Sequence, residues 1–101
     1  MFTLQISYPV RDYEAFKKVF DSDPAARAAS GARSVRLFRD TEDRDSVAVL
    51  LDFDTKDAAT AFLERLRSEV WDKPEVIGQL MSAPPSARIL EEVAREGQGA
   101  G

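Results

Sequence analysis

The side chains best suited to chemistry are one carboxylate and two guanidinium groups on what looks like a single sheet face. Asp52 interrupts the apolar run Ser46–Phe53, and Arg36 and Arg88 lie in two other stretches that alternate like strands. Because an unpaired carboxylate is costly in an apolar strand, Asp52 is expected either to form a cross-strand ion pair or to accept a proton. We predict all three as catalytic residues, with Asp52 deprotonating a phenol or enol and Arg36 or Arg88 stabilising the anion.

Five further side chains are predicted to contact a substrate. Gln5, Phe38 and Leu50 alternate onto the same face as the three charged groups. Tyr8 ends the first strand, where its hydroxyl could bind a substrate oxygen, and Trp71 follows the second long helix. Packing remains the alternative for both aromatics, since aromatic side chains dominate cores and interfaces.

Composition excludes several chemistries. The 101 residues include no cysteine and no histidine, which removes thiolate nucleophiles, Ser-His-Asp triads and metal sites built on these ligands. The net charge is −4, and no stripe of basic residues offsets it. We therefore expect no nucleic-acid partner. The acidic stretch Asp40–Asp45 lacks the glycine and spacing of a calcium loop. We predict no cofactor and no metal.

No apolar run is long enough to span a bilayer, and no basic start precedes an apolar stretch of signal-peptide type. The chain is therefore predicted to be cytoplasmic, with no membrane partner. Residues 1–95 are expected to form one domain, and the glycine-rich residues 96–101 a disordered tail.

The elements that must position these side chains occur in the same order twice. Strand, helix, short proline-started helix and strand run from about Phe2 to Arg39 and again from about Ser46 to Val93. The predicted strands are Phe2–Tyr8, Ala32–Arg39, Ser46–Phe53 and Ala87 to about Val93. Asp12 and Asp54-Thr55 are expected to cap the long helices, and Asp23-Pro24 and Lys73-Pro74 precede the short ones. This order predicts an α+β fold, a ferredoxin-like βαββαβ sandwich with a four-stranded antiparallel sheet and helices on one face.

Alternation then divides the strand residues between the two faces of that sheet. The covered face should hold the strongly apolar set: Phe2, Leu4, Ile6, Val35, Leu37, Val47, Val49, Leu51, Phe53 and Ile89. The open face is mixed, and two interpretations remain. Arg36, Asp52, Arg88 and Glu92 could form solvated cross-strand ion pairs, or two sheets could pack as a homodimer and enclose a ligand cavity.

Two halves of this kind in about 100 residues, with the stretches Tyr8–Asp12 and Phe20–Pro24, resemble the dimeric α+β barrel superfamily and its antibiotic-biosynthesis-monooxygenase-like domains. The resemblance implies a barrel-forming dimer with small-molecule chemistry in each protomer. The haem-degrading branch is disfavoured, because it typically needs a histidine ligand. Cofactor-free oxygenases of this superfamily use a tryptophan and an arginine near the substrate, which Trp71, Arg36 and Arg88 match by residue type. The expected function is a monooxygenase-like enzyme or binder of a small apolar or aromatic molecule; the alternative is a non-catalytic dimeric structural or ligand-binding module.

Overall fold

The computed structural model describes residues 1–23, 26–73 and 80–97. Four strands form one antiparallel sheet in the order β2-β3-β1-β4. The elements in chain order are β1 (Phe2–Pro9), α1 (Tyr13–Ser22), β2 (Ser34–Arg39), β3 (Ser46–Phe53), α2 (Lys56–Leu66), the π turn η1 (Arg67–Trp71) and β4 (Ser86–Glu91). The predicted βαββαβ sandwich is confirmed, and β3 lies inside the sheet as its apolar sequence indicates.

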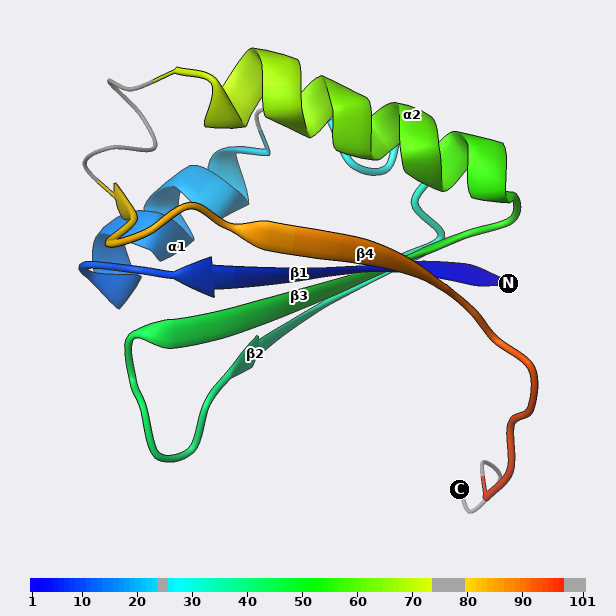
Figure 1. Cartoon of the computed structure of the whole chain (residues 1–101), viewed down its shortest axis with the longest axis horizontal. Coiled ribbons are helices and arrows are strands. Elements are labelled where there is room, and N and C mark those ends of the chain that lie inside the picture. The colour runs from blue at the N-terminus through cyan, green and yellow to red at the C-terminus, as the bar shows by residue number, and fades with distance from the viewer. Residues whose placement is uncertain (24–25, 74–79, 98–101) are drawn as a thin grey trace.

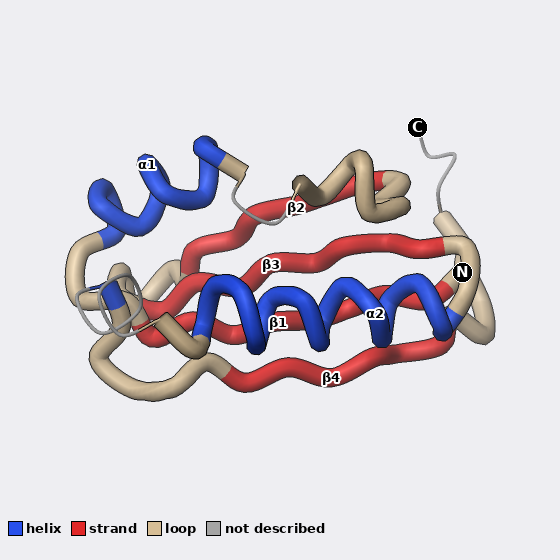
Figure 2. Tube along the Cα trace, turned by 90° about the horizontal axis from the view of Figure 1, so that it is seen from above, coloured by secondary structure: helices blue, strands red, loops and turns tan. Residues whose placement is uncertain are grey.

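Both long helices lie on the same side of the sheet, as Figure 1 shows in side view. Seen from above, α2 runs along β1 and α1 lies on the side of β2 (Figure 2). The helix α2 contacts β1, β3 and β4. One sheet face is therefore covered, and the other carries no element of the chain within the described residues.

The two helices begin at the residues that the sequence indicates. The Asp12 side chain accepts hydrogen bonds from the backbone N–H groups of Glu14 and Ala15, and the Thr55 hydroxyl accepts one from Ala58. These bonds satisfy N–H groups that have no partner inside the helix. The π turn η1 is a departure from the prediction. It extends α2 by five residues and ends at Trp71, and such wide turns are frequent at functional sites.

The segment after α1 forms hydrogen-bonded turns. Asp23 has the left-handed φ of 55° that ends α1, and its carboxylate accepts a bond from the Arg27 N–H at 2.9 Å. The Ser30 N–H bonds to the Ala26 carbonyl, and Gly31 with φ of 100° ends the segment. Pro24, residues 74–79 with the predicted Pro74 helix, and residues 98–101 of the predicted tail lie outside the described residues. The domain bounds 1–95 stay a prediction.

The core lies between the helices and the covered face. Leu4, Ile6, Val47, Val49, Leu51 and Phe53 are each at most 2% exposed, and they alternate with open-face residues along β1 and β3. The apolar stripe of α2 packs onto them through Ala59, Phe62, Leu63 and Leu66. Both the strand alternation and the helix stripe therefore follow the sequence prediction.

Candidate functional site

The predicted site residues fall into two groups on opposite faces of the sheet. Asp52, Arg36, Arg88, Phe38, Gln5 and Leu50 belong to the open face, as strand register shows. Tyr8 and Trp71 lie on the covered side, where both line a pocket beneath the helices. The eight side chains therefore do not converge on one site within a single protomer.

On the open face, Asp52 bonds to hydroxyl groups on the two neighbouring strands. The Thr3 hydroxyl donates to Oδ1 and the Ser34 hydroxyl to Oδ2, each at 2.6 Å. Desolvation acts to raise the pKa of Asp52, but these two bonds and the positive charges of Arg36 and Arg95 outweigh it and lower the pKa overall. Asp52 is therefore ionised near neutral pH and is a weak proton acceptor in this setting.

The two arginines of the open face lie on opposite edge strands. Leu50 and Gln5 separate Arg36 from Arg88 in one row across the sheet, so their Cα atoms are about 14 Å apart at the usual strand spacing. Arg88 donates to the Gln5 side-chain oxygen at 2.8 Å, and the Arg36 guanidinium lies 5.5 Å from the Phe38 ring. The two guanidinium groups therefore have separate contacts and no common partner within the described residues.

The cross-strand ion pairs proposed as one interpretation of this face are not formed. Among the described residues, none of Arg36, Asp52, Arg88 and Glu92 makes an ion pair with another of the four, and Glu92 pairs instead with Arg95 at 2.6 Å. Phe38 and Leu90 remain 44% and 40% exposed on the same face. A more open, polar hollow of about 310 Å³ lies between β1 and β4 and is lined by Gln5, Ser7, Ser86, Ala87 and Arg88.

The covered side holds a different kind of space. A pocket lies between the sheet, α1 and the helix formed by α2 and η1. Its volume is about 60 Å³. Its lining is almost entirely apolar and includes Ile6, Phe16, Val49, Phe62 and Val70. Four lining side chains carry polar atoms: Tyr8, Asp23, Arg27 and Trp71. An apolar lining with a few polar groups is typical of a small-molecule site, but usual sites measure roughly 300–1,000 Å³, so this pocket suits only a small molecule.

Tyr8 and Trp71 place two buried donors in this pocket. Tyr8 is 8% exposed, and its ring lies 5.0 Å from Phe16 and 5.9 Å edge-on from Trp71. Burial raises the pKa of Tyr8 to about 12, although the nearby Trp71 and the charge of Arg27 offset part of this effect. The Trp71 Nε1 lies near the Tyr8 hydroxyl but makes no hydrogen bond of standard geometry in the described part of the chain. A buried donor without a partner is uncommon and needs an explanation.

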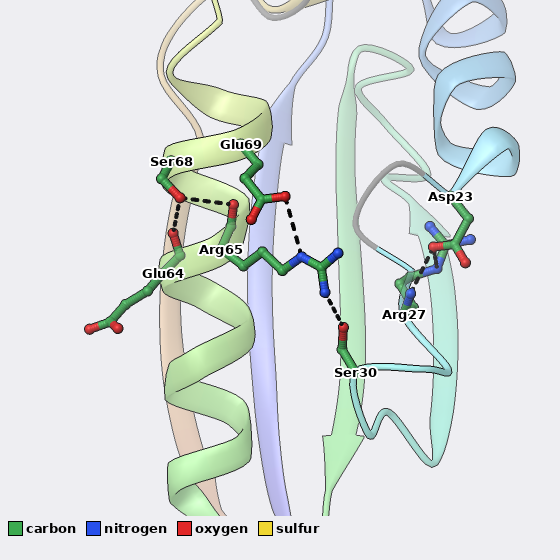
Figure 3. A network of polar contacts seen from close by, with 7 residues as sticks. All are labelled: Asp23, Arg27, Ser30, Glu64, Arg65, Ser68 and Glu69. Atoms are coloured by element: carbon green, nitrogen blue, oxygen red, sulfur yellow. Dashed lines mark hydrogen bonds and ion pairs between the residues drawn. The ribbon is translucent and has the colours of Figure 1, made fainter.

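Arg27 and Asp23 supply the charged part of the lining. The Arg27 guanidinium lies 3.8 Å from the centre of the Phe20 ring, and its Nε is 3.4 Å from Oδ1 of Asp23. Figure 3 shows this pair facing the helix α2, from which Arg65 reaches across to Ser30. The Arg65–Ser30 bond of 3.1 Å ties the turn segment to α2 beside the pocket. The sequence analysis did not identify Arg27 as a site residue. The available signal was its position four residues after Asp23, a spacing at which two side chains can meet on a helical turn.

The described residues contain no group of three carboxylates that could hold a metal ion. None of their helices has the length and apolar character needed to cross a membrane.

The fold is shared with solved structures of low sequence identity. A protein from Bordetella bronchiseptica, named as a candidate antibiotic biosynthesis monooxygenase, superposes with a TM-score of 0.66 at 20% identity, over 92% of this chain and 98% of its own. One of the same description from Nitrosomonas europaea gives a TM-score of 0.70 at 13% identity, over 91% and 89%. An uncharacterized NIPSNAP domain protein from Burkholderia xenovorans gives 0.63 at 19%, over 93% and 96%.

No protein-family model matches the chain, and no curated protein matches it by sequence. The structural matches confirm the predicted likeness to antibiotic-biosynthesis-monooxygenase-like domains at the level of the fold. Because the same fold carries several activities, the function has to be argued from the pocket and the open face.

Proposed function

We propose that this protein is a cytoplasmic homodimer that binds a small apolar or aromatic molecule in the pocket beneath its helices. One observation carries the proposal: the apolar pocket contains the Trp71 Nε1, a buried donor that lies near the Tyr8 hydroxyl but makes no hydrogen bond of standard geometry to the described residues. A ligand oxygen placed there would satisfy this donor and leave the rest of the ligand against apolar side chains.

The chemistry of the pocket suits a monooxygenase-like enzyme that works without a bound metal or cofactor. Since burial raises the pKa of Tyr8 to about 12, its hydroxyl stays protonated near neutral pH and can donate to a ligand oxygen. Trp71 and Tyr8 would then bind the substrate as predicted. The names of the Bordetella and Nitrosomonas neighbours favour oxygenation as the reaction.

The open face is proposed as the dimer interface. Phe38 and Leu90 are exposed apolar side chains on this face, and burying them against a second copy would remove them from water. The predicted catalytic role of Asp52, Arg36 and Arg88 would then draw on groups from both subunits, because the three form no ion pair with one another in the described protomer. A cavity between the two sheets is thus the second proposed ligand site, with Gln5, Phe38 and Leu50 on its wall.

A non-catalytic dimeric module is the alternative function. The observation that favours it is the state of Asp52, whose two oxygens already accept hydrogen bonds and whose pKa is lowered. Such a carboxylate ties strands together and has little capacity left for proton transfer.

Trp71 is the only tryptophan, so its fluorescence reports on the pocket directly. We expect 4-nitroanisole, a small uncharged aromatic molecule, to quench this fluorescence in a saturable manner. Val19 lines the pocket from α1, whereas the neighbouring Lys18 is exposed. Val19→Phe should fill the pocket and weaken binding by about tenfold or more, and Lys18→Phe should leave it unchanged. Quenching that never saturates, or that is equal in all three proteins, would contradict the proposal.

A further inference from the structure

The pocket beneath the helices contains a cation that an uncharged ligand would not need. We infer that it is built for a small planar molecule with one anionic oxygen, and that Arg27 is the residue that recognises this oxygen. This inference rests on the proposed function, because it names the class of ligand that the same pocket would bind. It adds a specificity residue that sequence reasoning did not single out.

Arg27 is held in place by contacts that leave much of its guanidinium available. The Arg27 Cζ lies 3.8 Å from the centre of the Phe20 ring, and this cation–π contact helps to hold the guanidinium in place. In the described part of the chain its ion-pair partner is Asp23, at 3.4 Å from Nε alone. That distance is long for a charge-assisted bond, for which 2.7–2.9 Å is typical. The terminal nitrogens therefore remain able to form the shorter contact that an anionic ligand oxygen offers.

The position of Arg27 in the pocket also fits this role. Its side chain is 19% exposed, so it lies at the boundary between the apolar interior and solvent. The Tyr8 hydroxyl is close enough to feel its charge. A ring that enters against Phe16 and Trp71 would thus bring an attached oxygen toward Tyr8 and Arg27 together.

The balance of donors and acceptors identifies the sign of the ligand charge. Of the four polar side chains that line the pocket, Tyr8, Trp71 and Arg27 can all donate hydrogen bonds, and only Asp23 is an obligatory acceptor. Asp23 already accepts from the Arg27 backbone N–H. An anionic oxygen can accept from several donors at once, whereas a cationic ligand would face Arg27 and leave the Trp71 Nε1 unpaired.

The shared chemistry is an oxyanion on an aromatic ring, which a phenolate or a carboxylate could provide. The test compares 4-nitrophenolate and 4-nitrobenzoate with uncharged 4-nitroanisole at mildly alkaline pH, by Trp71 quenching and by calorimetry. In the wild-type protein, we expect at least one of the two anions to bind about tenfold or more tightly than 4-nitroanisole. The one that binds more tightly distinguishes the phenolate from the carboxylate class.

Two neighbouring variants should act in opposite directions. Arg27→Gln should weaken binding of the anion by about tenfold and change 4-nitroanisole binding by less than about twofold. Asp23→Asn keeps the side-chain oxygen that accepts from the Arg27 N–H, and asparagine tolerates the left-handed backbone at this position. Because it removes the carboxylate that competes for Arg27, it should tighten binding of the anion several-fold. Arg67→Gln is the control, since Arg67 is exposed and does not line the pocket.

A spectroscopic readout separates recognition from a merely structural role. Contact with Arg27 should lower the pKa of bound 4-nitrophenol, which its absorbance reports, and Arg27→Gln should abolish that shift. If Arg27→Gln does not fold, Arg27→Lys and Asp23→Asn still test the charge. Anions that bind no more tightly than 4-nitroanisole would overturn this inference alone, and so would equal losses of all probes in Arg27→Gln. Failure of 4-nitroanisole and both anions to saturate would overturn the proposed function as well.

Discussion

The two faces of the sheet are built from alternate residues of the same strands, yet their polar groups are in opposite states. On the open face, Asp52 accepts bonds from Thr3 and Ser34, and Arg88 donates to Gln5. On the covered side, the Trp71 Nε1 makes no hydrogen bond of standard geometry within the described residues, and the ion pair of Arg27 with Asp23 is long at 3.4 Å. Under the proposed function, donors without a well-formed hydrogen bond in an apolar pocket are a stronger sign of a ligand site than charged side chains whose polar atoms already have partners.

The same contrast is visible in the two titratable groups that the sequence favoured. The pKa of Tyr8 is raised because burial disfavours its charged form. Desolvation acts to raise the pKa of Asp52, but two hydrogen bonds to its charged form and the charges of Arg36 and Arg95 together outweigh it, so the pKa is lowered. One group is kept neutral by its surroundings and the other is kept ionised, so the two faces suit different roles.

The largest expected effect is on the free energy of unfolding and comes from a substitution on the covered face of the sheet. Leu51 is 1% exposed, and its neighbour Leu50 points to the open face and is partly exposed. Leu51→Ala should lower the free energy of unfolding by about 3 kcal/mol, because it removes buried methyl groups and leaves a cavity. Leu50→Ala, the matched change one residue away, should cost about 1 kcal/mol or less in dilute protein. Urea denaturation measures both.

Repeating the measurement at several protein concentrations separates the Leu50→Ala and Leu51→Ala variants further. If the open faces meet in a dimer, the cost of Leu50→Ala should grow with concentration, whereas that of Leu51→Ala should not. Equal costs for the two variants in dilute protein would contradict the assignment of the faces.

The next effect concerns association. Phe38 is 44% exposed in the single chain, and the proposed dimer would bury it. Phe38→Glu should weaken the dimer by at least about thirtyfold, equivalent to roughly 2 kcal/mol, because a buried apolar contact is replaced by an unpaired charge. Sedimentation over a range of concentrations measures the dissociation constant. Ala61→Glu adds the same charge to the exposed surface of α2 and should have no such effect.

A wild-type protein that sediments as a monomer at all concentrations would exclude the shared barrel. A Phe38→Glu variant that associates as tightly as the wild type would place the interface elsewhere.

The fold could be predicted because each local signal agrees with the others. The alternation of β3 continues through all eight residues and that of β1 from Thr3 onward, with Phe2 only half-buried, and the stripe of α2 repeats at helical spacing. Asp12 and Thr55 mark the helix starts. The π turn η1 could not be predicted, since a one-residue widening after Leu66 leaves no clear mark in a stretch that is apolar at helical spacing.

The site was harder to predict because it depends on tertiary placement. Alternation put Tyr8 on the covered face, but the sequence could not show that Trp71 would lie edge-on against it across the core. Nor could it show that the turn after α1 returns Arg27 to the same pocket. Asp52 drew attention as a charge in an apolar strand, and its two hydroxyl partners come from strands far apart in the sequence.

The last expected effect concerns the neutral state of Tyr8. A folded-state pKa of about 12, raised from the usual 10.0, means that the folded protein holds the Tyr8 proton more tightly than the unfolded chain does. The resulting stabilisation is fully present below pH 10 and is lost as the pH rises from 10 to about 12. Tyr8→Phe removes this titrating proton. Between pH 10 and about 12, the free energy of unfolding of the variant should therefore fall less than that of the wild type, by on the order of 2 kcal/mol.

Urea denaturation at a series of alkaline pH values measures that difference, and Tyr13→Phe is the control because Tyr13 does not line the pocket. Parallel pH profiles for the wild type and Tyr8→Phe would mean that the phenol reaches solvent in the folded protein. Tyr8 could then not serve as a buried donor, and the contrast between the two faces would rest on Trp71 and Arg27 alone.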